Sequence, residues 1–215
     1  MSVERLSRVR KVIAVRMHES LQGSAQLTSV VEVDLGRAMA AKREHGVSPL
    51  ATVAAAAVCA LREHRALNAT IDLAAGTATY HEHVNLGCAV DTEAGLIVPN
   101  VKNAQELTAG ELGEAIRDLA QRVRNRGLHP EDLEGGTFTI TNTGSRGSLL
   151  DTPILNAPET GVLAVGKAER RPVVVDETIT IRDMAYLCLT YDHRLVDGAD
   201  AARFLTAVKA DLETT

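Results

Sequence analysis

The spacing of apolar residues separates the start of the chain into a helical and an extended segment. Ser7 to Leu21 places apolar side chains at helical intervals among arginines and lysines, which predicts a basic amphipathic helix that ends at Gly23. Such a helix can lie on a membrane, but it more often packs on its own domain or on a neighbouring subunit, and we expect residues 1–22 to do so. Gln26 to Asp34 has the pattern of a strand.

Three further helices follow from their caps and periodicity. Ser48 suits an N-cap and Pro49 the first helical position, and residues 51–61 are apolar on every side, which is typical of a helix buried all round. Thr108 and Glu111 have the spacing of a capping box. We therefore expect a second helix at 108–127. The helical spacing of apolar residues predicts the third at 199–212.

The second half of the chain is dominated by extended segments. They are predicted at 77–99 with a turn at Glu93-Ala94-Gly95, and at 137–141, 162–165, 172–176, 178–182 and 184–192. The step from Val175 to Thr178 indicates a hairpin, and Asn142 to Pro158 is a loop rich in Gly, Ser and Pro. No internal repeat or Pro-rich linker appears, so we expect one α/β domain.

Composition narrows the class of protein. A chain of 215 residues with 45% hydrophobic and 24% charged residues is ordinary for a soluble globular domain, which excludes disorder, collagen and coiled coil. A net charge of -5 with 2% aromatic residues argues against nucleic-acid binding. The charged N-terminus leads us to expect no secretory signal, and the longest apolar run is too short for a membrane span. Three cysteines without paired spacing fit reduced, mostly buried thiols in the cytoplasm: Cys59, Cys88 and Cys188.

Candidate chemistry is sparse until the end of the last strand. The chain has no P-loop and no dinucleotide-binding glycine motif. His81 and His83 could form a metal pair, but no third ligand is evident, so we expect no metal site. His193 follows an apolar strand, and Asp197 lies four residues later. This arrangement fits either a structural hydrogen-bonding histidine or a general base near pH 7.

Several spaced motifs nevertheless resemble one family along the whole chain. Residues 191–198, YDHRLVDG, resemble the HRxxDG signature of the 2-oxoacid dehydrogenase acyltransferase catalytic domain, the dihydrolipoamide acyltransferase family. This family is related in fold to chloramphenicol acetyltransferase. The other matching blocks are the basic helix 10–17, residues 64–69 (HRALNA, with Arg65 in place of the usual Pro), 85–92, 95–99, 135–142 (GGTFTITN) and 153–159 (PILNAPE).

The resemblance implies a fold, an assembly and a set of site residues. It implies a mixed sheet flanked by helices in one acyltransferase catalytic domain over residues 1–215, assembled as a homotrimer with the active site between subunits. His193 would be the general base, and Thr141 would stabilise the oxyanion. For Asp197 we favour a structural role, in which it pairs with Arg16 or Arg10 and holds the loop, over a direct role in catalysis. We expect coenzyme A to be a substrate bound by three residues: Asn142, Gly144 and Lys167.

Departures from the family pattern decide which acyl acceptor the sequence favours. The chain shows no lipoyl or subunit-binding domain, its 35–48 segment is short, and Ala54 to Ala57 replace aromatic residues, which could widen a pocket. Its polar 210–215 segment lacks the apolar tail that joins trimers into cages. We therefore expect a stand-alone biosynthetic acetyltransferase acting on a hydroxyl. The alternatives are the core of a 2-oxoacid dehydrogenase complex, moving acyl groups between dihydrolipoyl-lysine and coenzyme A, and an inactive scaffold.

Overall fold

A mixed β-sheet forms the centre of the computed structural model, which describes residues 1–92 and 95–214. Strands β9, β8 and β4 run parallel to one another, and the remaining pairs are antiparallel. The α/β class with a mixed sheet, predicted above, is therefore confirmed. In spatial order the strands are β1 (Gln26–Asp34), β11 (Thr178–Asp192), β9 (Gly161–Val165), β8 (Phe138–Asn142), β4 (Leu86–Cys88) and β7 (Asn100–Val101), with β10 (Glu169–Val175) paired to β11.

Two short hairpins lie outside this sheet. The first joins β2 (Ala69–Asp72) to β3 (Thr77–Tyr80), and β2 was missed by the sequence pattern. The second joins β5 (Val90–Thr92) to β6 (Gly95–Ile97). The turn predicted at Glu93-Ala94-Gly95 falls between β5 and β6, and its first two residues lie outside the described residues.

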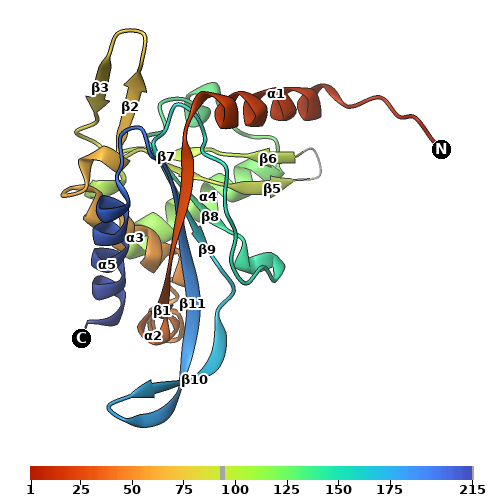
Figure 1. The fold of residues 1–215 in the computed structure, drawn as a ribbon. Coiled ribbons are helices and arrows are strands. Elements are labelled where there is room, and N and C mark those ends of the chain that lie inside the picture. The colour runs from red at the N-terminus through yellow and green to blue at the C-terminus, as the bar shows by residue number, and fades with distance from the viewer. Residues whose placement is uncertain (93–94, 215) are drawn as a thin grey trace.

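Four helices pack together around the core. They are α2 (Gly36–His45), α3 (Pro49–Leu61), α4 (Ala109–Arg124) and α5 (Gly198–Glu213). Helix α3 contacts α2, α4 and α5, while α5 packs on β1 and β11, α2 on β11, and α4 on β5 and β7 (Figure 1). Four short 3-10 helices complete the chain: η1 (Arg65–Leu67), η2 (Ala104–Glu106), η3 (Pro130–Leu133) and η4 (Gly144–Arg146).

The helix caps explain where α3 and α4 begin. Ser48 accepts a hydrogen bond from the backbone of Ala51, and Pro49 occupies the first turn of α3. At α4, Thr108 and Glu111 form the expected capping box, in which each side chain pairs with the other's backbone N–H. Both predicted helix starts are confirmed.

Alternation along the central strands gives the sheet two different faces. Phe138 and Ile140 of β8 are buried in the main core on the helix-covered face. Thr139 and Thr141, at the intervening positions, therefore point to the opposite face. The polar side chains of β8 that bear on the candidate active site therefore lie on that face.

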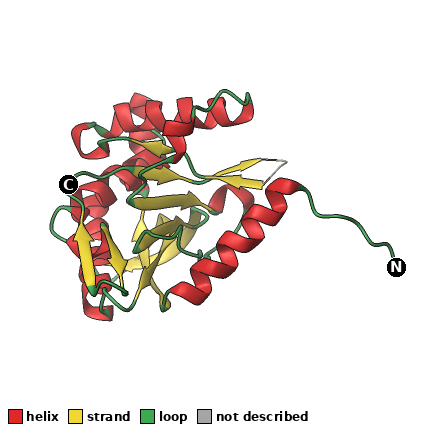
Figure 2. Ribbon diagram, turned by 90° about the horizontal axis from the view of Figure 1, so that it is seen from above, coloured by secondary structure: helices red, strands yellow, loops and turns green. Residues whose placement is uncertain are grey.

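Helix α1 (Arg8–Gly23) is set apart from the other helices (Figures 1 and 2). Ser20 is its one buried residue, and its hydroxyl donates to the carbonyl of Leu155 at 2.7 Å. Apolar side chains on its outer turns, including Val12 and Val15, are about half exposed. The expected contact of this helix with a neighbouring subunit stays a prediction.

Several expectations about the fold need correction. The strands predicted at 178–182 and 184–192 are one strand, β11, because backbone pairing continues through polar Asp183 even though the apolar pattern is interrupted there. Ala54, Ala56 and Ala57 are buried in the core among neighbouring helices, so they do not widen a pocket. The hairpin at Val175 to Thr178 is confirmed.

Two features that bear on the class of protein follow from burial and helix length. Cys88 and Cys188 are buried and Cys59 is exposed, and all three are free thiols. Within the described residues no single helix is long and apolar enough to cross a membrane. One bent pair, α2 with α3, passes such a test by length and composition only.

Candidate active site

His193 stands in the turn that joins β11 to α5. Its backbone N–H donates to the carbonyl of Ala25 at 2.8 Å, which ties the turn to the start of β1. Its side chain is 41% exposed, and its ring lies 5.7 Å from the ring of buried Tyr191. The backbone is thus fixed while the imidazole stays accessible, which suits a group that must meet a substrate.

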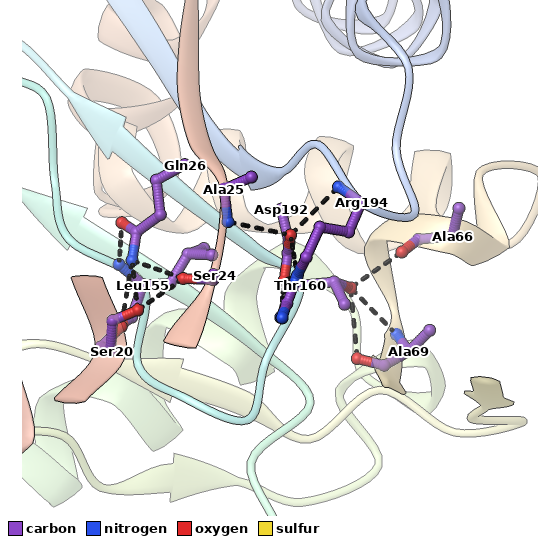
Figure 3. Close-up of polar contacts among 10 residues, drawn as sticks. All are labelled: Ser20, Ser24, Ala25, Gln26, Ala66, Ala69, Leu155, Thr160, Asp192 and Arg194. Carbon is purple, nitrogen blue, oxygen red and sulfur yellow. Dashed lines mark hydrogen bonds and ion pairs between the residues drawn. The ribbon is translucent and has the colours of Figure 1, made fainter. Parts of the chain in front are cut away.

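A buried carboxylate, Asp192, holds this turn in place (Figure 3). It is 3% exposed, and its oxygens accept hydrogen bonds from the side chain of Arg194 at 2.5 to 3.0 Å. The backbone N–H groups of Arg194 and Ala25 also donate to it, at 3.1 and 3.4 Å. Burial alone would raise the pKa of Asp192, but the hydrogen bonds and charge of Arg194 outweigh it and lower the pKa below its usual value.

The sequence pattern did not identify the two neighbours of His193, Asp192 and Arg194, as functional residues. A signal was present, because an acid and an arginine stand on either side of the histidine in the string Asp192-His193-Arg194. Two residues of opposite charge at positions i and i+2 across a turn can pair around the residue between them. A second set of contacts in Figure 3 holds the adjacent chain segment, where Thr160 donates to the carbonyl of Ala66 at 2.8 Å.

Asp197 lies beside the histidine but not beside an arginine. Its carboxylate is 4.0 Å from His193 Nδ1 and 82% exposed. Arg16 borders a different cavity, under α1, so the expected pairing of Asp197 with Arg16 or Arg10 is wrong within one chain. The reason is that Asp197 precedes α5 on an exposed turn, whereas α1 contacts β6 of the second hairpin.

Thr141 lines an open cavity of about 600 Å³ near the end of β8. The cavity is bordered by β4, β5, β8 and α4, and its charged side chains include Arg124 and Arg146, the latter paired with Asp91. Cys88 also lines it, but burial raises the pKa of this thiol to about 12. Cys88 is therefore a neutral thiol rather than a nucleophile.

The three residues expected to bind coenzyme A lie beside one another near this cavity. Asn142 lines it, and the Asn142 side chain accepts a hydrogen bond from the backbone N–H of Ser145 at 3.0 Å. Gly144 approaches the next strand closely, since an added Cβ would stand 2.4 Å from the backbone of Gly166 and Lys167. Lys167 forms an exposed ion pair with Glu169 at 2.7 Å.

One chain does not bring His193 and Thr141 together. Thr141 pairs with Ala164 of β9, and Ala164 pairs with Cys188 of β11. His193 lies five residues beyond Cys188, about 16 Å along the strand, and two strands add about 10 Å sideways. The base and the hydroxyl therefore lie at opposite ends of the sheet, too far apart to act on one bond.

The two histidines considered as a metal pair follow β3. The rings of His81 and His83 are 6.1 Å apart, and burial together with the neighbouring ring lowers the pKa of His81. Among the residues that the structure describes, no three His, Cys, Asp or Glu side chains gather as a metal site would need. The expectation of no metal stays a prediction.

Known proteins align with this sequence along nearly its full length. The family described as 2-oxoacid dehydrogenases acyltransferase (catalytic domain) matches residues 1–215. The dihydrolipoyllysine-residue acetyltransferase component of the pyruvate dehydrogenase complex of Corynebacterium glutamicum is 47% identical over 99% of this chain and 34% of that protein. A dihydrolipoyllysine-residue succinyltransferase component of the 2-oxoglutarate dehydrogenase complex, from Bartonella vinsonii, is 42% identical over 97% of this chain and 53% of that protein. The chain thus spans about a third to a half of these curated relatives.

Solved structures share the fold. A probable dihydrolipoamide acetyltransferase from Listeria monocytogenes superposes with a TM-score of 0.92 at 36% identity, covering 100% of this chain and 97% of that one. The Azotobacter vinelandii dihydrolipoamide acetyltransferase gives 0.91 at 29% identity, covering 100% and 92%. Chloramphenicol acetyltransferase, at 15% identity and 0.63 over 99% of each chain, shows the same fold more distantly.

These relatives overturn one expectation about function. The stand-alone biosynthetic enzyme with a hydroxyl acceptor is wrong, because the matched relatives are dihydrolipoyllysine acyltransferases of dehydrogenase complexes. The departures that suggested it were weak evidence, since the alanines at 54–57 are core residues. The family resemblance itself is confirmed. The chain belongs to the 2-oxoacid dehydrogenase acyltransferase family, as a catalytic domain with the chloramphenicol acetyltransferase-like fold.

Proposed function

We propose that this chain transfers acetyl groups between dihydrolipoyl-lysine and coenzyme A, as the catalytic domain of the acyltransferase component of a 2-oxoacid dehydrogenase complex. One observation carries the proposal: dihydrolipoyllysine-residue acyltransferase components of such complexes align with 97–99% of the chain. Acetyl is favoured over succinyl because the 45–47% identical relatives are acetyltransferases, while the succinyltransferase is 42% identical.

His193 acts as the general base in this reaction. It takes the proton of the attacking thiol of dihydrolipoamide, and the resulting thiolate attacks the thioester carbon of acetyl-coenzyme A. When the carbon–sulfur bond to coenzyme A breaks, the imidazolium returns the proton to the leaving thiolate. A positioned base contributes about 10²–10⁴-fold to such a step.

Thr141 stabilises the tetrahedral intermediate. Its hydroxyl donates to the oxygen that becomes negatively charged when the thiolate adds to the carbonyl carbon. Fixed donors of this kind act where charge develops and need no reorganisation during the reaction. The position of Thr141 at the wall of an open cavity gives a substrate access to its hydroxyl.

Asp197 assists His193. In the Azotobacter vinelandii enzyme a serine, a histidine and an asparagine have been studied for their role in the catalytic mechanism, and that histidine and asparagine are four positions apart. His193 and Asp197 have the same spacing, and their side chains approach to 4.0 Å. A carboxylate at this position favours the imidazolium that forms during proton transfer.

The active site is shared between copies of the chain. Because His193 and Thr141 lie at opposite ends of the sheet in one chain, His193 of one copy must meet Thr141 of another. A cyclic homotrimer provides three equivalent contacts of this kind and closes on itself. The half-exposed apolar side chains of α1 are available for contact with a neighbouring copy.

Coenzyme A occupies the cavity that contains Thr141. Asn142 lines the cavity, and Gly144 and Lys167 lie beside it. The positive charges near the opening, among them Arg124, suit the phosphate groups of this substrate. The proposed reaction uses no resident metal. The dihydrolipoyl group takes part as a substrate and is not attached to residues 1–215.

Chromatographic measurement of free coenzyme A and of the acetylated acceptor tests the proposed reaction. Acetyl-coenzyme A is mixed with free dihydrolipoamide or with candidate alcohols, and the rate is compared with succinyl-coenzyme A as donor. We expect turnover with dihydrolipoamide and acetyl-coenzyme A. Turnover of an alcohol without turnover of dihydrolipoamide would contradict the proposal.

Light scattering after size exclusion tests the assembly. We expect a particle of three times 22.9 kDa, or a whole multiple of that trimer. A solved structure similar to this chain is the cubic core of a pyruvate dehydrogenase multienzyme complex, so a multiple of the trimer agrees with the proposal. A monomer would contradict the shared site. A cytoplasmic location stays a prediction.

A further inference from the structure

A buried acid that the proposed reaction does not use lies on the same face of the sheet as Thr141. Glu159 is 3% exposed and sits in the loop before β9. Thr139 Oγ1 donates to Glu159 Oε2 at 2.6 Å, and Asn156 Nδ2 donates to Glu159 Oε1 at 2.7 Å. Thr139 precedes Thr141 by two positions on β8, so both side chains share one face.

A second polar group beside this acid has no partner. Asn100 is 5% exposed, and its Oδ1 is buried without a hydrogen bond among the described residues. Its Nδ2 faces the carbonyls of Asp132 and Glu134, at 3.2 and 3.4 Å, which directs Oδ1 away from them. A buried acceptor without a donor costs free energy, so a donor is expected at this point.

Gly136 brings the two groups together. A Cβ at this position would stand 2.4 Å from Asn100 Oδ1 and 2.9 Å from Glu159 Oε1, so both oxygens border the same small volume. The missing side chain of glycine leaves that volume free. Two oxygens that both lack a proton repel each other there, whereas a proton between them makes a hydrogen bond.

We propose that Glu159 is held as a neutral carboxylic acid that donates to Asn100 Oδ1, and that it thereby positions the strand carrying Thr141. The Glu159 cluster, Glu159 with Thr139, Asn156 and Asn100, joins β8, β7 and the loop before β9. This proposal rests on the proposed function only because it assigns Thr141 a catalytic role.

The charged surroundings agree with a neutral acid. The charged side chains that border the cavities beside Glu159 are Arg8 and Arg16 of α1, Glu19, Glu134, Asp192 and Arg194. Among the described residues none forms an ion pair with Glu159, and Asp192 and Arg194 pair with each other. Burial, opposed by the hydrogen bonds from Thr139 and Asn156, raises the pKa of Glu159 to about 7.

The neutral acid makes stability depend on pH in a defined direction. Between the ordinary value of 4.5 and about 7, the folded protein keeps a proton that the unfolded chain has lost. The unfolded state then binds fewer protons, so the contribution of Glu159 to the free energy of unfolding falls as pH rises through this window. Glutamine has the same shape and keeps a donor, so E159Q removes this dependence.

Three variants of the whole chain test the proposal. E159Q keeps a donor toward Asn100, E159L removes every polar atom, and E134Q makes the same chemical change at an exposed position on the same cavity. The infrared difference spectrum of wild type minus E159Q at pH 6 reports the state of the carboxyl. We expect a protonated carboxyl band, and a carboxylate band in its place would overturn the proposal.

Amide exchange and kinetics report the position of β8. We expect residues 138–142 to exchange faster in E159L and normally in E159Q and E134Q. The kcat of E159L should fall about tenfold or more with an unchanged KM for acetyl-coenzyme A, and E159Q should restore it. Normal exchange in E159L would overturn the positioning role. If even the wild type fails to turn over dihydrolipoamide, the proposed function fails, while the infrared band and amide exchange still decide this proposal.

Discussion

Replacing Asp192 by alanine should disable the enzyme without touching a reacting atom. The carboxylate holds the turn that presents His193, through the side chain and backbone of Arg194 and the backbone of Ala25. Without it, four N–H donors lose their acceptor, and the turn is free to shift. A shift of about 1 Å in a catalytic group can cost about 10²-fold in rate.

The cost in stability can be derived from burial. Breaking a buried ion pair by removing one partner costs about 3–5 kcal/mol. The Asp192 side chain is 4% exposed, but that of Arg194 is 29% exposed, so water compensates part of the loss. We therefore expect D192A to lower the free energy of unfolding by about 2–4 kcal/mol. Asp192 has a lowered pKa, so its contribution is complete above the ordinary value of 3.8 and is lost as pH falls below it.

Urea unfolding and steady-state kinetics measure both effects. The matched control is D200A, which removes an acid paired with Arg203 on the exposed start of α5 and should cost less than about 1 kcal/mol. We expect D192A to lower kcat far more than D200A does. If D192A matched D200A in both stability and kcat, the reasoning that Asp192 positions His193 would be refuted.

Three substitutions test other parts of the site. His193→Ala should lower kcat by about 10²–10⁴-fold with the fold intact by circular dichroism, and near-normal turnover would remove the histidine from its role as base. Thr141→Val keeps the side-chain shape and should lower kcat by about 10²–10³-fold, whereas an effect on KM alone would make Thr141 a binding residue. Gly136→Ala places a Cβ 2.4 Å from Asn100 Oδ1 and should lower the unfolding free energy by about 1–3 kcal/mol, so an unchanged urea midpoint would contradict that close approach.

Local chemistry made much of the fold predictable. The capping residues Ser48 and Thr108 act within their own turns, so sequence spacing was enough to place the starts of α3 and α4. The same holds for β1, whose bounds of Gln26 and Asp34 match the prediction. Where tertiary pairing overrides the local pattern, as at Asp183 inside β11, the apolar pattern predicted two strands instead of one.

The site was less predictable because its contacts join distant segments. Asp192, beside His193, accepts a hydrogen bond from the backbone of Ala25, which lies 167 positions earlier, and Glu159 accepts one from Thr139, 20 positions earlier. The family resemblance predicted His193 and Thr141 as site residues, but the motifs contained no information on the distance between them within one chain. The acceptor was misjudged for a related reason, since the small residues of α3 were assigned to a pocket although they face the core.

Mixing two inactive variants tests the shared active site most directly. His193→Ala and Thr141→Val are produced separately and also coexpressed in equal amounts, and turnover of acetyl-coenzyme A with dihydrolipoamide is measured for each preparation. If each site takes its histidine from one copy and its threonine from the next, about a quarter of the sites in randomly mixed trimers contain both intact groups. The account predicts that the mixture regains about a quarter of wild-type activity while each variant alone stays inactive. A mixture as inactive as its components would contradict it.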